Sequence, residues 1–380
     1  MIYKAFLNRQ EITGFPVKGV ETDEIWGGDV LFWKKSEEVA SNVFIFEWKD
    51  EITFTLKGNG EVTVENSYGY STTSPKSTSV RQFKYQKNGV YKTKLTLQAN
   101  VKFILAFVNK KIQDNSTTYH YESSLTRILS AIPVNISRVT TNASFAFYTP
   151  DFCVTGPNTN APYFYEVPEK LFQYHKKFTT IDYAFYNCEN FKKIPTKLLD
   201  GMTELESVEN TFRRTSITEI PETLFYDCTK IHLFSNTFGN TDITEIPAGL
   251  FATQKEPNTF TGCFRGTKIT RVSAELFSWI SNIPKDDWPS STISFQETFM
   301  DCTELRYVDD NLLSFMITNT SWTYWIRIAK IFSGCSKMAN APKLWTVSDS
   351  GYKNAPYGSD DAYENCISLP WYSEIPSTMK

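Results

Sequence analysis

A short motif, an apolar residue followed by proline, recurs through the middle of this chain and constrains its fold more than any other feature. The prolines stand at positions 168, 195, 221 and 247, at intervals of 27, 26 and 26 residues. A column of phenylalanines keeps the same step, at positions 185, 212, 238 and 264. A fixed period of this size is typical of a solenoid, in which each unit buries its apolar face against its neighbours. Because proline fixes φ and begins a helical turn well, we expect one strand and one short helix or turn in each unit.

The segment Phe185-Tyr-Asn-Cys188-Glu-Asn-Phe191-Lys-Lys-Ile194-Pro195 shows the unit most clearly. It resembles the BspA-type leucine-rich repeat, whose signature is Phe-x-x-Cys-x-x-Leu-x-x-Ile-Pro, and the resemblance covers roughly residues 122–380. It implies a leucine-rich-repeat solenoid over residues 118–380, with an atypical first part because terminal repeats must close one face. The family occurs on bacterial and protist surface proteins and in phage structural proteins. The resemblance therefore implies binding to a protein or a cell surface, without fixed ligand residues.

Residues 40–116 alternate apolar and polar side chains at period two, with breaks at the glycine turn 58–60 and the Ser/Thr/Pro stretch 71–79. This spacing predicts an antiparallel β-sandwich of immunoglobulin-like type. The order is similar to the polycystic-kidney-disease-like sandwich, which usually carries a Trp-Gly-Asp-Gly turn. Residues 65–70 read Glu-Asn-Ser-Tyr-Gly-Tyr instead, so the prediction stays at an immunoglobulin-like sandwich. The expected fold class of the whole chain is mainly β with short helices.

Residues 1–36 are expected to form a small β segment of short strands around glycine turns. A piece of this size buries little surface, so it needs support from a partner. Residues 25–34 read Ile-Trp-Gly-Gly-Asp-Val-Leu-Phe-Trp-Lys and resemble a short motif of phage tail and fibre proteins. The resemblance implies a virion-docking end, and an ordinary β-hairpin edge is the alternative. The residues assigned to docking are Ile25, Trp26, Asp29, Phe32 and Trp33.

Charge and composition exclude several classes of partner. The net charge of −3 provides no basic field for nucleic acid. No run of about 18 apolar residues occurs, so no membrane insertion is expected. The first residues lack the basic-then-apolar layout of a signal peptide, and we expect a chain made in a cytoplasm and not exported by that route.

The sequence predicts no enzyme, no cofactor and no metal site. The three histidines, His120, His175 and His232, share no metal-ligand spacing, and no known catalytic or phosphate-binding motif occurs. Paired aspartates such as 360–361 are interpreted as solvated loop charges. The chain has seven cysteines, and those in related settings are expected to be small buried core residues, not disulfides. They are Cys188, Cys263, Cys302, Cys335 and Cys366.

After residue 277 the repeat loosens, and the extra residues fall in the segments 281–291, 318–324 and 348–361. Such insertions cluster on one face of a solenoid, which is often the binding face. Tryptophan and tyrosine are favoured interface anchors, and we predict that those in or near the insertions bind a partner. They are Trp279, Trp288, Trp322, Tyr324, Trp325, Tyr352 and Tyr357. The alternative is that they cover core beneath long loops.

Taken together, the repeats, the sandwich and the docking-like start resemble tail-fibre or head-decoration proteins of crAss-like and related gut phages. The resemblance implies a non-enzymatic virion protein, assembled in the host cytoplasm, that contacts other virion proteins through residues 1–36. It would bind a host surface protein or glycan, as a symmetric homo-oligomer or as part of a larger assembly. Two alternatives stay open. One is a bacterial cell-surface adhesin, which an export signal upstream of Met1 would favour. The other is a fibre-borne polysaccharide depolymerase, which needs a carboxylate cleft.

Overall fold

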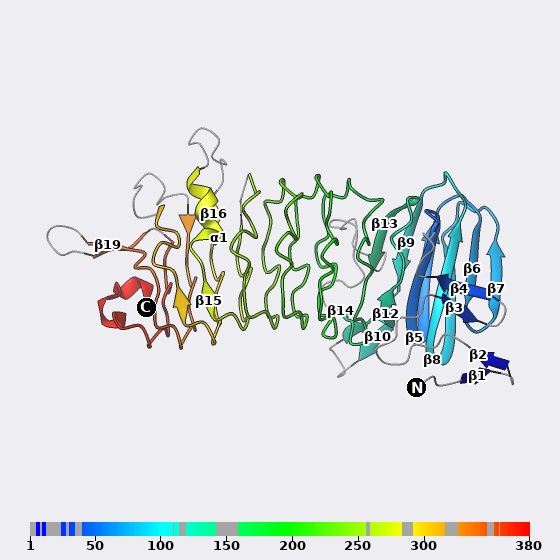
Figure 1. Ribbon diagram of the computed structural model, residues 1–380, viewed down its shortest axis with the longest axis horizontal. Coiled ribbons are helices and arrows are strands. Elements are labelled where there is room, and N and C mark those ends of the chain that lie inside the picture. Colours follow the sequence, from blue (N-terminus) through cyan, green and yellow to red (C-terminus); the bar gives the residue numbers. More distant parts are fainter. Residues whose placement is uncertain are drawn as a thin grey trace.

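The computed structural model describes residues 5–7, 10–12, 24–27, 30–34, 40–108, 110–113, 119–141, 159–255, 259–282, 292–315, 326–347, 353–356 and 358–380. The chain is mainly β, with 26% of its residues in strands and 5% in helices. The expected fold class is confirmed at this level. Figure 1 shows an elongated molecule with a folded sheet at one end and a stack of coils at the other.

Fourteen described strands, β1 to β14, form the hairpins and sheets at the N-terminal end of the structure. The N-terminal hairpins are β1 (Ala5–Leu7) with β2 (Gln10–Ile12) and β3 (Glu24–Gly27) with β4 (Val30–Lys34). A larger sheet has the order β13-β9-β5-β8-β6-β7, with β12 paired to β5. Its strands are β5 (Val43–Lys57), β6 (Val62–Asn66), β7 (Tyr70–Ser74), β8 (Arg81–Leu97), β9 (Phe103–Phe107), β12 (Leu125–Ile128) and β13 (Ile136–Thr141). A small sheet joins β10 (Lys110–Gln113), β11 (Tyr119–Glu122) and β14 (Thr159–Asn160).

The long hairpin of β5 and β8 bends in its middle. Its register slips at Asp50, which has a φ of 61° and accepts a hydrogen bond of 2.8 Å from the Gly89 amide. Phe46 and Phe54 stand eight positions apart on β5, a distance of about 26 Å on a straight strand. Their ring centroids nevertheless lie 5.5 Å apart. The two halves of the sheet therefore face each other across an apolar core.

The sheet extends beyond residue 116, the boundary expected from the sequence. Hydrogen bonding places β12 beside β5 and β13 beside β9, although both strands fall in the segment assigned to the repeats. The free edge of β12 pairs with the first coil. Arg127 and Glu166 form a parallel β-bridge, and the Ile128 amide donates to the Glu166 carbonyl at 3.1 Å. β12 thus joins the sheet to the coils.

The coils stack in register through two parallel ladders. The first runs through Thr180, Ser207, Leu233, Thr259 and Ser294, and it continues from β16 (Ile293–Ser294) to β18 (Ile326–Arg327). The second runs from β15 (Arg271–Val272) to β17 (Tyr307–Val308) and on to Asn340. The segments 217–220 and 243–246, which read Ile-Thr-Glu-Ile, precede β15 on this side of the stack, and the Thr270 amide donates to the Thr244 carbonyl at 3.2 Å. Within the described residues, this ladder is regular enough to count as strand only from residue 271 onward.

Each apolar-proline step begins a tight turn. The amides of Leu198, Leu224 and Leu250 donate to the carbonyls of the prolines three positions earlier, at 3.0 to 3.2 Å. One coil extends this turn into the helices α1 (Glu275–Ser278) and η1 (Trp279–Asn282). The last part of the chain contains the hairpin of β19 (Thr346–Val347) and β20 (Lys353–Asn354) and the helical turns η4 (Tyr372–Glu374) and η5 (Ser377–Met379).

An aromatic column fills the interior of the stack. Its members are fully buried, and the ring centroids of neighbours lie 5.6 to 5.8 Å apart. They are Phe185, Phe212, Phe238, Phe264, Phe299, Phe332 and Tyr363. The column therefore continues through the coils whose sequence spacing loosens.

A second buried column stands three residues after the first and contains cysteine or threonine. Its members are Cys188, Thr215, Thr241, Thr267, Cys302, Cys335 and Cys366. The grouping of Cys263 with these cysteines was wrong. Phe260 stands three residues before Cys263 but stacks on Phe234 and Phe295 in a separate column, whereas Cys263 directly precedes Phe264. The six cysteines of the described residues are buried free thiols, and Cys153 lies outside those residues.

The C-terminal tail covers the last coil. The amides of Asp361 and Tyr363 donate to the carbonyls of Thr378 and Met379, which occupy the place of a further coil. The Tyr363 hydroxyl donates to the Pro342 carbonyl at 2.5 Å. With β12 at one end and the tail at the other, both ends of the ladder have backbone partners.

Candidate functional site

Two residues in each coil adopt a left-handed backbone conformation, two positions before and two positions after the aromatic column. The row after the column consists of Asn187, Arg214, Asn240, Gly266, Asp301, Gly334 and Asn365, with φ between 56° and 80°. Asparagine, aspartate and glycine accept positive φ, whereas other residues adopt it at a cost of about 1–2 kcal/mol. This row forms a corner at which each coil turns between its two ladders.

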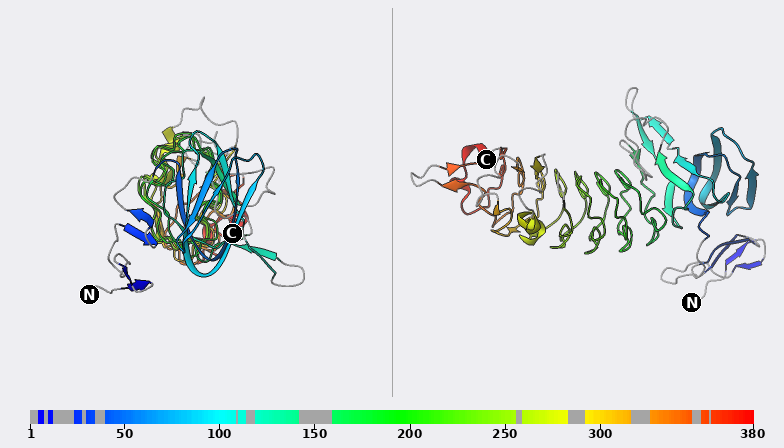
Figure 2. Two further views of the ribbon diagram at one scale, coloured as in Figure 1. Left: turned by 90° about the vertical axis from the view of Figure 1, so that its right-hand side faces the viewer. Right: turned by 90° about the horizontal axis from the view of Figure 1, so that it is seen from above.

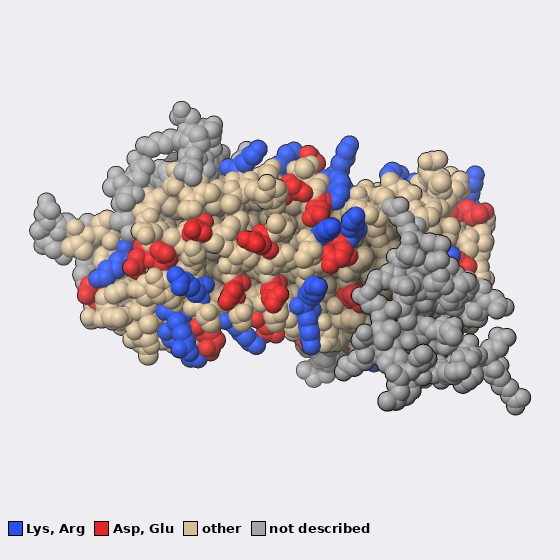
Figure 3. Space-filling view, viewed as in Figure 1, with Lys and Arg blue, Asp and Glu red and all other residues tan. Residues whose placement is uncertain are grey.

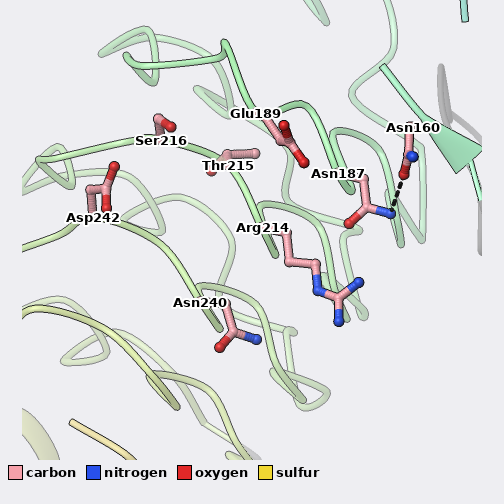
Figure 4. Close-up of a pocket in the computed structure, with 8 residues that line it drawn as sticks. All are labelled: Asn160, Asn187, Glu189, Arg214, Thr215, Ser216, Asn240 and Asp242. Carbon is pink, nitrogen blue, oxygen red and sulfur yellow. Dashed lines mark hydrogen bonds between the residues drawn. The ribbon is translucent and has the colours of Figure 1, made fainter. Parts of the chain in front are cut away.

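A polar groove follows this corner along the first coils (Figure 4). It has a volume of about 470 Å³ and is open to solvent along its length. Its lining residues are all polar or charged: Asn160, Asn187, Glu189, Arg214, Thr215, Ser216, Asn240 and Asp242. Because they come from successive coils, the stacking of the coils creates the groove.

The floor of the groove is buried and its walls are exposed. Asn187 and Thr215 are 6% and 4% exposed. The Asn187 amide donates to Asn160 Oδ1 at 3.2 Å, and the Thr215 hydroxyl donates to the Phe212 carbonyl at 2.8 Å. Glu189, Arg214 and Asn240 are exposed on the walls. The floor is therefore held by internal hydrogen bonds, while the walls face solvent.

Many charges on the coils are paired with a neighbouring coil. Lys268 lies 2.7 Å from Asp242, Lys230 lies 2.6 Å from Glu204, and Lys337 lies 2.6 Å from Glu304. Figure 3 shows basic and acidic side chains interspersed over the face of the coils that is turned to the viewer. Such exposed pairs contribute little stability, about 0–1 kcal/mol each.

Arg214 and Glu189 differ from those paired residues. Within the described part of the chain, neither side chain forms a hydrogen bond or an ion pair. Figure 4 shows the Arg214 guanidinium between the amides of Asn187 and Asn240. A guanidinium offers five N–H donors, a carboxylate only acceptors, and an amide both. Asp242 is paired with Lys268, so the groove can bind a ligand that carries acceptors and donors, with any negative charge placed at Arg214 and away from Glu189.

The aromatic residues predicted to bind a partner lie largely outside the described residues. Trp279 is described. It lies in η1, packs half-buried against the core, and buries its indole Nε1 without a hydrogen-bond partner among the described residues. Its position favours the alternative that it covers core. The other six, Trp288, Trp322, Tyr324, Trp325, Tyr352 and Tyr357, lie outside the described residues.

The residues predicted for docking lie in the second N-terminal hairpin. Ile25 and Trp26 belong to β3, Phe32 and Trp33 to β4, and Ile25 is the cross-strand partner of Trp33. Asp29 lies outside the described residues. The docking role stays a prediction.

Sequence reasoning missed the groove, although the sequence contains a signal for it. The position two residues after each column aromatic is Asn, Asp or Gly in every coil but one, where it is Arg214. A comparison of this position across the repeats would have singled out Arg214. What it could not reveal is which neighbouring side chains are already paired.

The buried cysteine and histidine side chains have structural roles in the coils. Burial raises the pKa of Cys228 and of Cys366 to about 12, so both thiols stay protonated at neutral pH. His175 Nε2 lies 2.9 Å from the Pro133 carbonyl. The described residues contain no group of three or more His, Cys, Asp or Glu side chains placed to bind a metal ion.

In the described part of the chain, no helix has the length and apolar character needed to cross a membrane. No family model, curated protein or solved structure matches the chain.

Proposed function

We propose that this chain is a non-enzymatic structural protein of a phage virion, in the tail, a fibre or a head decoration. Residues 1–36 dock onto other virion proteins. An immunoglobulin-like sandwich from residue 40 supports a BspA-type leucine-rich-repeat solenoid that reaches the C-terminus. The solenoid presents its surface to a host surface protein or glycan.

The observation that carries the proposal is the continuous stack of coils from β12 to the C-terminal tail. Each coil contacts its neighbours, and both ends of the stack have backbone partners. A stack of this kind is stable without a partner at its ends and exposes a long surface, on which every coil can present different side chains. These are the properties required of a display module.

The arrangement of the parts agrees with docking through residues 1–36 and binding along the coils. Figure 2 shows β1 to β4 beside the folded sheet, far from the last coils. Arg127 of β12 links the sheet to the first coil, because its guanidinium lies 3.3 Å from Glu166 of that coil and also pairs with Glu47 of β5 inside the sheet. The Glu47 carboxylate is 5% exposed and accepts hydrogen bonds from the Arg127 guanidinium at 2.8 and 3.0 Å. A firm joint of this kind holds the coils away from the docking end.

Immunogold electron microscopy of purified phage particles tests the proposal. Antibodies against residues 159–380 should label the particle at a tail, fibre or capsid position, and the purified protein should bind the host cell. Label on the bacterial envelope and not on particles would instead support an adhesin. Release of reducing ends from host polysaccharide by the purified protein would support a depolymerase.

A further inference from the structure

Arg214 is out of place in the row of left-handed residues at the coil corner. Its φ is 57°, and the other members of its row are Asn, Asp or Gly. Residues in costly backbone conformations persist where the surroundings require them, and such residues cluster at functional sites. The observation therefore demands a reason for an arginine at this position.

The bulky members of the other left-handed row have such a reason within the fold. Glu297 pairs with Arg265 at 2.6 Å, and Lys330 lies 3.9 Å from Asp361. The Tyr183 ring packs against Tyr186, with centroids 5.6 Å apart. The Arg214 side chain makes no comparable contact within the described residues. Its guanidinium is therefore available to a ligand.

We propose that the groove around Arg214 binds an anionic, hydroxyl-rich glycan chain, with Arg214 as the anchor for its carboxylate or phosphate. A guanidinium pairs with either group through two parallel hydrogen bonds. The exposed Asn240 amide flanks the anchor, and the Ser216 hydroxyl and the Glu189 carboxylate complete a set of partners for sugar hydroxyls. The groove crosses successive coils, so a chain of repeated units can meet one coil per unit. This inference rests on the proposed function, since it names the host-surface molecule that the coils would bind.

The lining favours a glycan over a peptide. Protein interfaces depend on apolar and aromatic anchors seated in pockets, whereas all eight residues that line the groove are polar or charged. A peptide would leave its apolar side chains in water there. A glycan replaces its hydration with hydrogen bonds of similar number.

The test uses Arg214→Asn and a matched control, Lys330→Asn, in the full chain. Both variants place asparagine at a left-handed position and remove one positive charge, but Lys330 does not line the groove. The probes for isothermal titration calorimetry are oligogalacturonate, its carboxyl-reduced derivative, a glycerol-phosphate oligomer and poly-glutamate. Oligogalacturonate and the glycerol-phosphate oligomer distinguish a carboxylate from a phosphate as the anionic group.

We expect saturable binding of at least one of the two anionic polyhydroxyl probes. Arg214→Asn should weaken it by about tenfold to a hundredfold, the value of a charge-assisted hydrogen-bonded contact, while Lys330→Asn should leave it unchanged. The Arg214→Asn protein should melt no lower than the wild type, because asparagine suits its φ. If the protein binds oligogalacturonate, it should bind the carboxyl-reduced derivative at least tenfold more weakly.

Four results would overturn the assignment. Neither anionic glycan binds, or Arg214→Asn binds as the wild type does, or poly-glutamate binds as tightly as the glycans, or oligogalacturonate binds but its carboxyl-reduced derivative binds equally tightly. The experiments distinguish an error in the groove assignment from an error in the proposed function. If Arg214→Asn protein still binds host cells and the wild type is found in virions, only the groove assignment is lost. If the wild type is absent from virions, the proposed function itself is lost.

Discussion

Replacing Phe238 by alanine should destabilise the stack of coils near its middle. The Phe238 side chain is fully buried, and its ring stacks on Phe212 and Phe264 at 5.6 Å each, with interplanar angles of 9° and 6°. Core Phe→Ala changes cost about 3–5 kcal/mol, and stacked rings add about 0.5–1.5 kcal/mol each beyond buried area. Because Phe238→Ala loses two stacked contacts, its expected loss of unfolding free energy is at the upper end of this range, about 5 kcal/mol. Phe238→Leu keeps most of the volume and should cost only about 1–2 kcal/mol.

Hydrogen exchange and urea unfolding measure this effect. Because each coil is supported by its neighbours, Phe238→Ala should reduce protection in the coils on both sides, and the sheet around Phe46 should keep its protection. Tyr226→Ala is the control, since Tyr226 is 66% exposed and its loss should change stability by less than about 0.5 kcal/mol. A Phe238→Ala protein as stable as the Tyr226→Ala protein would show that the aromatic column does not support the stack.

Three further predictions follow from the same geometry. Gly334→Ala should lower the melting temperature more than Gly69→Ala: both have positive φ (80° and 89°), but only at Gly334 would a Cβ meet a neighbouring coil, with Asp301 Oδ1 at 2.6 Å. Equal losses would contradict the close packing of the corners. Glu47→Gln should cost about 2 kcal/mol, because it leaves the arginine of β12 without its buried carboxylate. Hydrogen exchange in β12 should be faster in this variant, and unchanged exchange would show that the Glu47–Arg127 pair does not hold β12 in place. Burial raises the pKa of Cys228 to about 12, against about 8.5 in an unfolded chain, so its contribution to stability is complete below pH 8.5 and declines from there toward pH 12. The alkaline loss of stability in urea titrations should therefore be shallower for Cys228→Ala than for the wild type, and a parallel slope would refute the role of burial.

The columns of the stack could be predicted because they repeat. Pro195, Pro221 and Pro247 each begin a turn in which the leucine three positions later donates back to the proline carbonyl. The Phe185 column follows from the same period, since residues at equal positions in stacked coils must lie above one another. Local sequence preference and tertiary packing favour the same structure at these positions, so the repeat can be predicted from the sequence.

Other features depended on partners that are distant in the sequence. Residues 125–128 have weak repeat spacing, and their strand pairs on one side with β5 and on the other with the first coil. Cys263 stands in a motif like that of Cys302, yet it occupies another column. In both cases the apolar pattern was compatible with two neighbours, and only the hydrogen bonds selected one.

The sequence by itself determined that apolar residues recur at a period suited to stacked coils, because this period is a property of single residues and their spacing. The tertiary structure alone decided where the sheet ends, which aromatic rings stack, and which polar side chains meet in the groove at Arg214. These outcomes depend on contacts between coils 26 or more residues apart, and no local pattern specifies whether a charge such as that of Arg214 finds a partner.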